Sequence, residues 1–433
     1  MIAQKQTRWL ATFLTVATLS SVPLTGHAQV ISAPTSPVVP TVSTSPVAST
    51  GLTTPSPVTP PPASAASGWA SLGSYVKIDG RLFAGIYKTE PDGAYPNRGF
   101  VVPDAKLRFT FTPNKDITTV VRFAIANAMP YSSTAALNTT TNAITITPGL
   151  GIDLLYVDVN DWAGLLPGQV ARVGKHVVDF GEEVWSADPE DANLITNSAA
   201  GIIDLEGGLN LRGTVPINAQ HPLLYSLDVT NDNAASVTSA QTPLLTVVKL
   251  ANSPQKNLYI SVSGSTTGTI TGATSMAVAN LTAKPTGAAS WSQQIGELDV
   301  RYNFGPTGFK ADVGTVVTAP FQLAGAVGAF GGQANGGGNN RDGSYWFAEG
   351  RYNVTQKFYA AARVSNVGLD NGYKDKLDGS PIAVNSYERT SLGLGYSISP
   401  LVHLKGEYTI NTTGGGASSP RLNQLSLGFA TKF

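Results

Sequence analysis

Apolar and polar side chains alternate with a period of two along most of the chain after residue 74. In residues 297–302, for example, Leu298, Val300 and Tyr302 fall on one face and charged residues fall on the other. Successive side chains of a β-strand point to opposite sides, so this period predicts strands. We predict sixteen of them, centred near residues 80, 108, 122, 155, 173, 210, 226, 247, 260, 299, 313, 348, 361, 392, 407 and 428.

The segments between these runs alternate in length. Short segments rich in Pro, Gly, Asn and Asp, which favour tight turns, occupy residues 113–116, 253–256, 305–308, 353–356 and 399–402. Long segments rich in Gly, Ser, Thr and Asn occupy residues 128–149, 179–206, 265–293, 318–342 and 368–384. Short turns at one end and long loops at the other are typical of an up-and-down membrane barrel. The Gly-rich run 331–338 is accordingly predicted to be a mobile external loop.

The composition supports a barrel that crosses a membrane. Charged residues make up 13% of the chain, Cys is absent, and no apolar stretch beyond the N-terminus is long enough for a spanning helix. Each predicted strand keeps one apolar face, which suits lipid, and one face that retains charge. We therefore predict an all-β protein, a sixteen-stranded antiparallel transmembrane up-and-down β-barrel. A soluble β-solenoid or sandwich is the alternative, but it would not need an apolar face on every strand.

The N-terminal part divides into two segments that precede the barrel. Residues 1–28 have a basic start, an apolar centre and small residues before Gln29, which predicts a signal peptide cleaved after Ala28. An N-terminal anchor helix is the alternative. Residues 29–73 are rich in Pro, Ser and Thr and predict a disordered periplasmic linker, or else a tether to the cell wall. The barrel is expected to occupy residues 74–433.

Two segments resemble bacterial outer-membrane porins. The C-terminal run 425–433, which ends in Phe433, is similar to the terminal strand of those proteins. Residues 171–181 are similar to a strand of phosphate-selective porins that leads into an inward-folded third loop, although a dense Arg/Lys cluster around that loop is missing here. The resemblance implies a homo-trimer in the outer membrane of a Gram-negative-type bacterium. It also implies that Phe433 is part of the signal read by the barrel-assembly machinery.

The alternation assigns a set of side chains to the lumen, and basic residues predominate in it. The basic pore-lining candidates are Lys77, Arg81, Lys106, Arg108, Arg122, Arg172, Arg212, Arg301, Arg351, Arg363, Arg389 and Lys405. The loop after the fifth strand, in contrast, has no Lys or Arg. Its candidate constriction residues are Glu182, Glu183, Trp185, Asp188, Glu190 and Asp191.

A basic wall facing an acidic loop would produce a transverse field across a constriction. Two alternatives stay open at this point. The wall charges can simply pair with cross-strand neighbours, and the acidic loop can be solvated or bind divalent cations.

These observations predict a porin for passive diffusion of small hydrophilic solutes or ions, with a mild anion preference. The alternative is a structural or adhesive outer-membrane barrel tethered to the envelope. The sequence has neither an H-E-x-x-H nor a G-x-S-x-G motif, so we expect no enzyme, and we expect no metal or cofactor. The expected partners are outer-membrane lipid, the barrel-assembly machinery, two further copies of the chain and the cell wall through the linker, but no nucleic acid.

Overall fold

The structure is a computed structural model. It describes residues 75–91, 99–127, 137–138, 143–144, 151–162, 168–183, 190, 192–202, 205–217, 221–231, 244–255, 257–269, 290–304, 309–310, 316–317, 321–335, 341–369, 375–376, 383–414 and 422–433. The predicted signal peptide and linker therefore lie outside the described residues. No helix among the described residues is long and apolar enough to cross a membrane.

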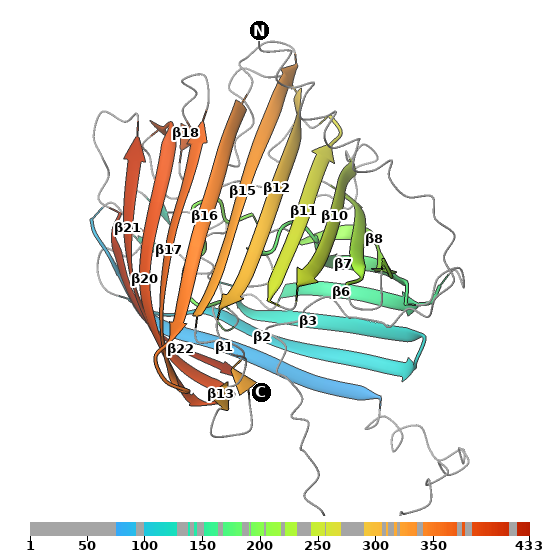
Figure 1. Cartoon of the computed structure of the whole chain (residues 1–433), viewed down its shortest axis with the longest axis horizontal. Coiled ribbons are helices and arrows are strands. Elements are labelled where there is room, and N and C mark those ends of the chain that lie inside the picture. The colour runs from blue at the N-terminus through green and yellow to red at the C-terminus, as the bar shows by residue number, and fades with distance from the viewer. Residues whose placement is uncertain are drawn as a thin grey trace, which may run out of the picture.

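Sixteen antiparallel strands form one closed barrel, as the sequence predicted, and β1 closes the ring against β22 (Figure 1). Their bounds are β1 (Val76–Thr89), β2 (Gly99–Asn114), β3 (Ile117–Asn127), β6 (Gly151–Asn160), β7 (Val170–Val177), β8 (Leu205–Val215), β9 (Leu223–Asn231), β10 (Leu244–Gln255), β11 (Leu258–Thr267), β12 (Ser290–Phe304), β15 (Phe321–Asn335), β16 (Arg341–Asn353), β17 (Phe358–Leu369), β20 (Ser386–Ser399), β21 (Val402–Gly414) and β22 (Gln424–Lys432). Each strand pairs with its neighbour in the sequence of barrel strands, which is an up-and-down topology.

Three short hairpins, in which each strand has two residues, lie outside the barrel sheet. They are β4 (Leu137–Asn138) with β5 (Ala143–Ile144), β13 (Phe309–Lys310) with β14 (Val316–Val317), and β18 (Asp375–Lys376) with β19 (Ala383–Val384). Each belongs to a connection between two barrel strands.

One predicted strand is wrong. The sequence placed a strand near residue 313 because Phe309, Ala311 and Val313 alternate with charged residues, but the eleventh barrel strand is β15 at 321–335. The prediction of a mobile external loop at 331–338 is wrong for residues 331–335, which pair with β12 and, at 331–332, also with β16; residues 336–338 lie outside the described residues. The alternation of loop lengths is consequently not strict. β12 ends and β15 begins at the end of the short turns, with 16 residues between them, whereas β15 ends and β16 begins at the opposite end, with five residues between them.

The two ends of the barrel chain meet at one end of the barrel. Gly80 and Phe433 exchange both backbone hydrogen bonds, at 3.0 Å each. This is the end at which β2 and β3, and β20 and β21, are joined by tight turns. An even number of antiparallel strands requires this arrangement, because each strand reverses the direction of the one before it.

The barrel has its apolar face outside and its polar face inside. Ile78, Phe100 and Val327 are 58%, 71% and 54% exposed on the outside. Buried inside are charged side chains from ten of the sixteen strands, among them Asp104, Asp228 and Glu407. A soluble protein has the reverse arrangement. An apolar outer surface of this extent is suited to hydrocarbon, because lipid cannot solvate charge.

Replacing Gly428 by Val should destabilise the seam between β22 and β1. A Cβ atom at this position would overlap the ring of Phe83, which is fully buried on the inner face. Overpacking of this kind costs about 1–3 kcal/mol. We expect a lower thermal transition for the folded barrel, measured by its heat-modifiable migration on gels. Gly296→Ala is the control, since nothing lies within 4 Å of a Cβ there; an equal loss in both variants would contradict the explanation.

Candidate functional site: the inner wall and the inward loop

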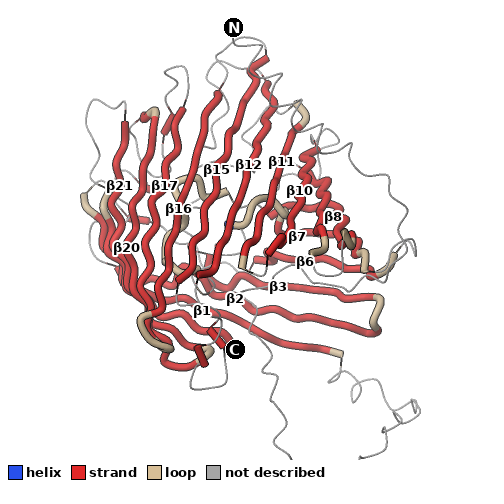
Figure 2. Tube along the Cα trace, in the orientation of Figure 1, coloured by secondary structure: helices blue, strands red, loops and turns tan. Residues whose placement is uncertain are grey.

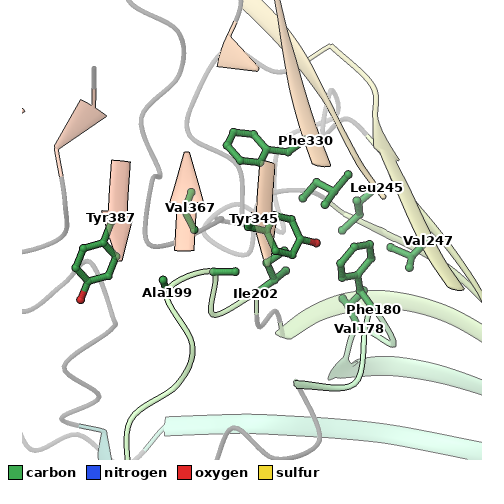
Figure 3. Close-up of a cluster of buried hydrophobic side chains, with 12 residues drawn as sticks. Val178, Phe180, Ala199, Ile202, Leu245, Val247, Phe330, Tyr345, Val367 and Tyr387 are labelled. Atoms are coloured by element: carbon green, nitrogen blue, oxygen red, sulfur yellow. The ribbon is translucent and has the colours of Figure 1, made fainter. Parts of the chain in front are cut away.

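The connection between β7 and β8 folds into the barrel. We call residues 178–202 the inward loop, of which 178–183, 190 and 192–202 are described. Figure 2 shows this segment in tan, running behind β16, β15 and β12 rather than outside the strands. Its apolar residues pack on inward-facing apolar side chains of the wall (Figure 3). The loop contributes Val178, Phe180, Ala199, Ala200 and Ile202, and the wall contributes Leu245, Val247, Ile295, Phe330, Tyr345, Val367 and Tyr387.

The root of the loop is held by a buried lysine on β10. Lys249 Nζ lies 2.9 Å from Asp179 Oδ1 and 2.8 Å from Glu182 Oε1, and it donates to the carbonyl of Gly181 at 2.6 Å. Gly181 has a φ of +61°, and a Cβ there would overlap the carboxylate of Glu297. Only glycine fits this close approach of the loop backbone to the wall.

Glu182 turns toward the wall rather than toward the lumen. Its carboxylate accepts hydrogen bonds from Tyr259 Oη and, at 3.3 Å, from Ser261 Oγ, and Arg301 lies 3.7 Å away. Its backbone N–H donates to Asp299 Oδ1 at 3.3 Å. The charge of this glutamate is therefore compensated where the loop meets β11 and β12.

The carboxylate of Glu183 likewise contacts the protein rather than the open lumen. It accepts hydrogen bonds from the backbone N–H and the hydroxyl of Ser198, so it ties the outgoing part of the loop to the returning part. Arg363 on β17 lies 3.6 Å from the same carboxylate. Arg363 is 4% exposed and also binds Glu349 of β16, with Nε 2.7 Å from Oε2.

The tip of the loop, residues 192–197, rests on the last strands of the barrel. Glu407 of β21 accepts hydrogen bonds from the backbone N–H groups of Ile195 and Thr196. Arg363 and Arg389 donate to the carbonyls of residues 196 and 197, each at 2.8 Å. The side chain of Ile195 packs with Phe83, Tyr87 and Ala430, so the tip reaches β22 and β1.

Five of the predicted basic residues therefore contact the loop. Arg301 binds Glu182, and Arg351 binds Asn193. Arg363 binds Glu183 and the carbonyl of residue 196. Arg389 and Lys405 bind the carbonyls of residues 197 and 192. These side chains lie on the inner face, where they contact the inward loop. They lie on the ten barrel strands from β9 to β22, on which most of the described loop docks, and we call this part of the wall the docking wall.

The other predicted basic residues form a separate group on the first six strands. Among the described residues, seven basic side chains pair with four aspartates, so these eleven residues carry a surplus of three positive charges. We call this group the basic array. Its ion pairs are Lys77 and Arg108 with Asp79, Arg81 and Lys106 with Asp104, Arg122 with Asp153, and Arg172 and Arg212 with Asp158.

The register of the array brings like charges together. Arg81 lies directly opposite Lys106, and Arg108 lies directly opposite Arg122. Like charges at facing positions of a sheet are destabilising, so the shared aspartates reduce a repulsion that a purely structural wall would avoid. Arg108 and Lys77 are the more exposed members, with side chains 40% and 73% accessible.

The predicted acidic constriction is only partly described. Glu182, Glu183 and Glu190 are buried, whereas Trp185, Asp188 and Asp191 lie outside the described residues. The sequence predicted that the loop carboxylates face a basic wall across a constriction; in the structure Glu182 binds Lys249, and Glu183 binds Ser198 and lies near Arg363, where the loop docks. Asn193, whose side chain binds Arg351 and Glu349 at the tip, was not among the candidates. Among the described residues, no group of three or more His, Asp or Glu side chains is arranged to hold a metal ion.

The sequence matches no described protein family and no curated protein. The structure, however, is similar to solved bacterial outer-membrane proteins. The outer membrane channel DcaP of Acinetobacter baumannii is 11% identical with a TM-score of 0.53, and the match covers 83% of this chain and 97% of that one. An anion-selective porin from Comamonas acidovorans is 12% identical with a TM-score of 0.51, covering 83% and 99%.

OprB of Pseudomonas putida is 11% identical with a TM-score of 0.52, and the match covers 84% of this chain and 95% of that one. At such low identity the likeness establishes the fold alone. The chain therefore has the sixteen-stranded barrel fold that these bacterial outer-membrane porins share.

Proposed function

We propose that the protein is an outer-membrane porin through which small hydrophilic solutes and ions diffuse passively. The observation that carries the proposal is the basic array on the inner wall, which the described part of the inward loop leaves to one side while it docks on the opposite strands. A barrel of sixteen strands is wide enough to hold an aqueous channel. A loop folded into such a channel narrows it, and polar walls keep the remaining space wetted.

The array favours a mild anion preference. Its surplus of three positive charges produces a local potential that attracts anions, while the loop glutamates at 182 and 183 are compensated by wall cations. Phosphate is one member of this class, consistent with the local resemblance of residues 171–181 to phosphate-selective porins. In this proposal the protein has no enzymatic role.

The proposal includes a location and partners. After export by the signal peptide at 1–28, the barrel is inserted into the outer membrane of a Gram-negative-type bacterium with Phe433 as part of its assembly signal. The barrels associate as a homo-trimer, and residues 29–73 extend on the side of the short turns, toward the cell wall. The meeting of β1 with β22 at that end supports this orientation of the linker.

Planar-bilayer recordings of the purified full chain test the proposal. We expect stepwise, ohmic openings because a wetted lumen conducts ions in proportion to voltage. In a salt gradient the reversal potential should have the sign of an anion-preferring pore. A folded, heat-modifiable barrel that leaves the bilayer silent would instead support the structural or adhesive alternative.

A further inference from the structure

The tip of the inward loop is held by two buried side chains of opposite charge. Glu407 of β21 is 2% exposed, and it accepts the backbone N–H groups of residues 195 and 196 together with the hydroxyl of Thr196. Arg363 of β17 donates to the carbonyl of residue 196 at 2.8 Å. The two strands flank β20, so the side chains of Glu407 and Arg363 bind one peptide segment from both sides. We call this pair the peptide clamp.

The clamp is needed because the tip has no secondary structure of its own. Buried backbone N–H groups must find partners, and at residues 195 and 196 both find the same carboxylate. Hydrogen bonds to an ionised acceptor are about twice as strong as neutral ones. Apolar contacts add to the clamp, because Ile195 packs on the cluster around Phe83 and Tyr87 and the buried Leu194 packs on Tyr359 and Ala361. The clamp is the part of this arrangement that satisfies the buried backbone groups at residues 195 and 196.

The tip is also the part of the loop that approaches the basic array. Ile195 contacts Phe83 on β1, two residues along the strand from Arg81, which pairs with Asp104 in the array. We propose that Glu407, together with Arg363, is the positioning group that fixes the loop tip and thereby sets the size limit of the pore. This inference rests on the proposed channel function.

The clamp can be tested by substitution and, because the chain has no cysteine, also by an engineered disulfide. Glu407→Gln removes the negative charge that gathers the loop N–H groups. We expect it to raise the population of the undocked tip about tenfold, seen as added open-channel current noise and as entry of larger polyethylene glycols in liposome swelling. Glu388→Gln on β20, at an exposed position, is the matched control and should behave as wild type.

A reversible staple separates positioning from general loosening of the barrel. The hydroxyl oxygens of Thr196 and Ser391 lie 3.2 Å apart, close enough for paired cysteines to form a disulfide. In the Glu407→Gln background, oxidation of Thr196→Cys with Ser391→Cys should restore quiet, size-limited pores, and reduction should reverse this. Noise that persists in the oxidised form would overturn the inference.

The possible outcomes distinguish a failure of the clamp from a failure of the proposed porin function. A silent wild-type protein would overturn the proposed porin function. A conducting wild type whose Glu407→Gln variant stays as quiet and as size-limited as Glu388→Gln would overturn the clamp alone. If Glu407→Gln does not fold, Thr196→Val replaces it, because it removes only the hydroxyl bonded to Glu407 and Ser391. Thr196→Val should raise the open-channel current noise less than Glu407→Gln would, and noise equal to that of the wild type would count against the clamp.

Discussion

Reversing the charge of Lys77 and Arg108 together is expected to turn an anion-preferring pore into a cation-preferring one. Each reversal changes the charge of the basic array by two units, so its surplus of three becomes a deficit of one. These two residues are the most exposed of the array, and glutamates there remain in contact with water. The reversal potential in a salt gradient should change sign, most clearly at low ionic strength where screening is weak.

Lys88→Glu provides the control for this change. Lys88 is exposed on the outward face of β1, on the same side as Ile86, so it contributes nothing to the wall of the lumen. The single variant should leave the reversal potential as it is in the wild type. If the double reversal also left it unchanged, the array would not be part of the conduction path.

Removing the lysine at the loop root should cost the most stability of any single change considered. Lys249→Met leaves Asp179 and Glu182 without their buried cation, and it leaves the carbonyl of Gly181 without a donor. Breaking a buried ion pair by removing one partner costs about 3–5 kcal/mol. We expect a loss of this size in the free energy of unfolding, measured by urea denaturation in lipid vesicles.

The comparison for Lys249→Met is Lys115→Met. Lys115 is exposed in the turn between β2 and β3, and its side chain forms no ion pair with any residue that the structure describes. We expect a change close to zero for this variant. Similar losses in the two variants would show that the root of the loop is not held by Lys249.

The sequence predicted the barrel well where the inner face carries charge. β1, β2 and β12 alternate between aliphatic and charged residues, and their positions agree with the prediction. The prediction failed at β15, whose sequence FQLAGAVGAFGGQAN has no charged residue and mostly small side chains on both faces. Nearby, residues 309–313 alternate more clearly, although only residues 309–310 of them are described and they lie in a separate hairpin.

The alternation predicts which residues share a face of each strand, but the sequence does not reveal which of them the loop covers. That division depends on contacts between distant residues, such as Glu407 with Thr196 and Arg363 with Glu183. One signal was available. Leu245 and Val247 are apolar at inward positions beside Lys249, and an apolar patch on a polar wall indicates that something packs on it.

Single cysteines at three positions test the central claim most directly. Arg108→Cys lies on the open inner wall, Phe109→Cys on the lipid face of the same strand, and Ser365→Cys on the inner wall beneath the loop, where Ser365 Oγ accepts the N–H of Ala199 at 2.8 Å. In lipid vesicles, a water-soluble maleimide should label position 108 readily and positions 109 and 365 hardly at all. Equal labelling at 108 and 109 would contradict the barrel alternation, and fast labelling at 365 would contradict a loop docked on that wall.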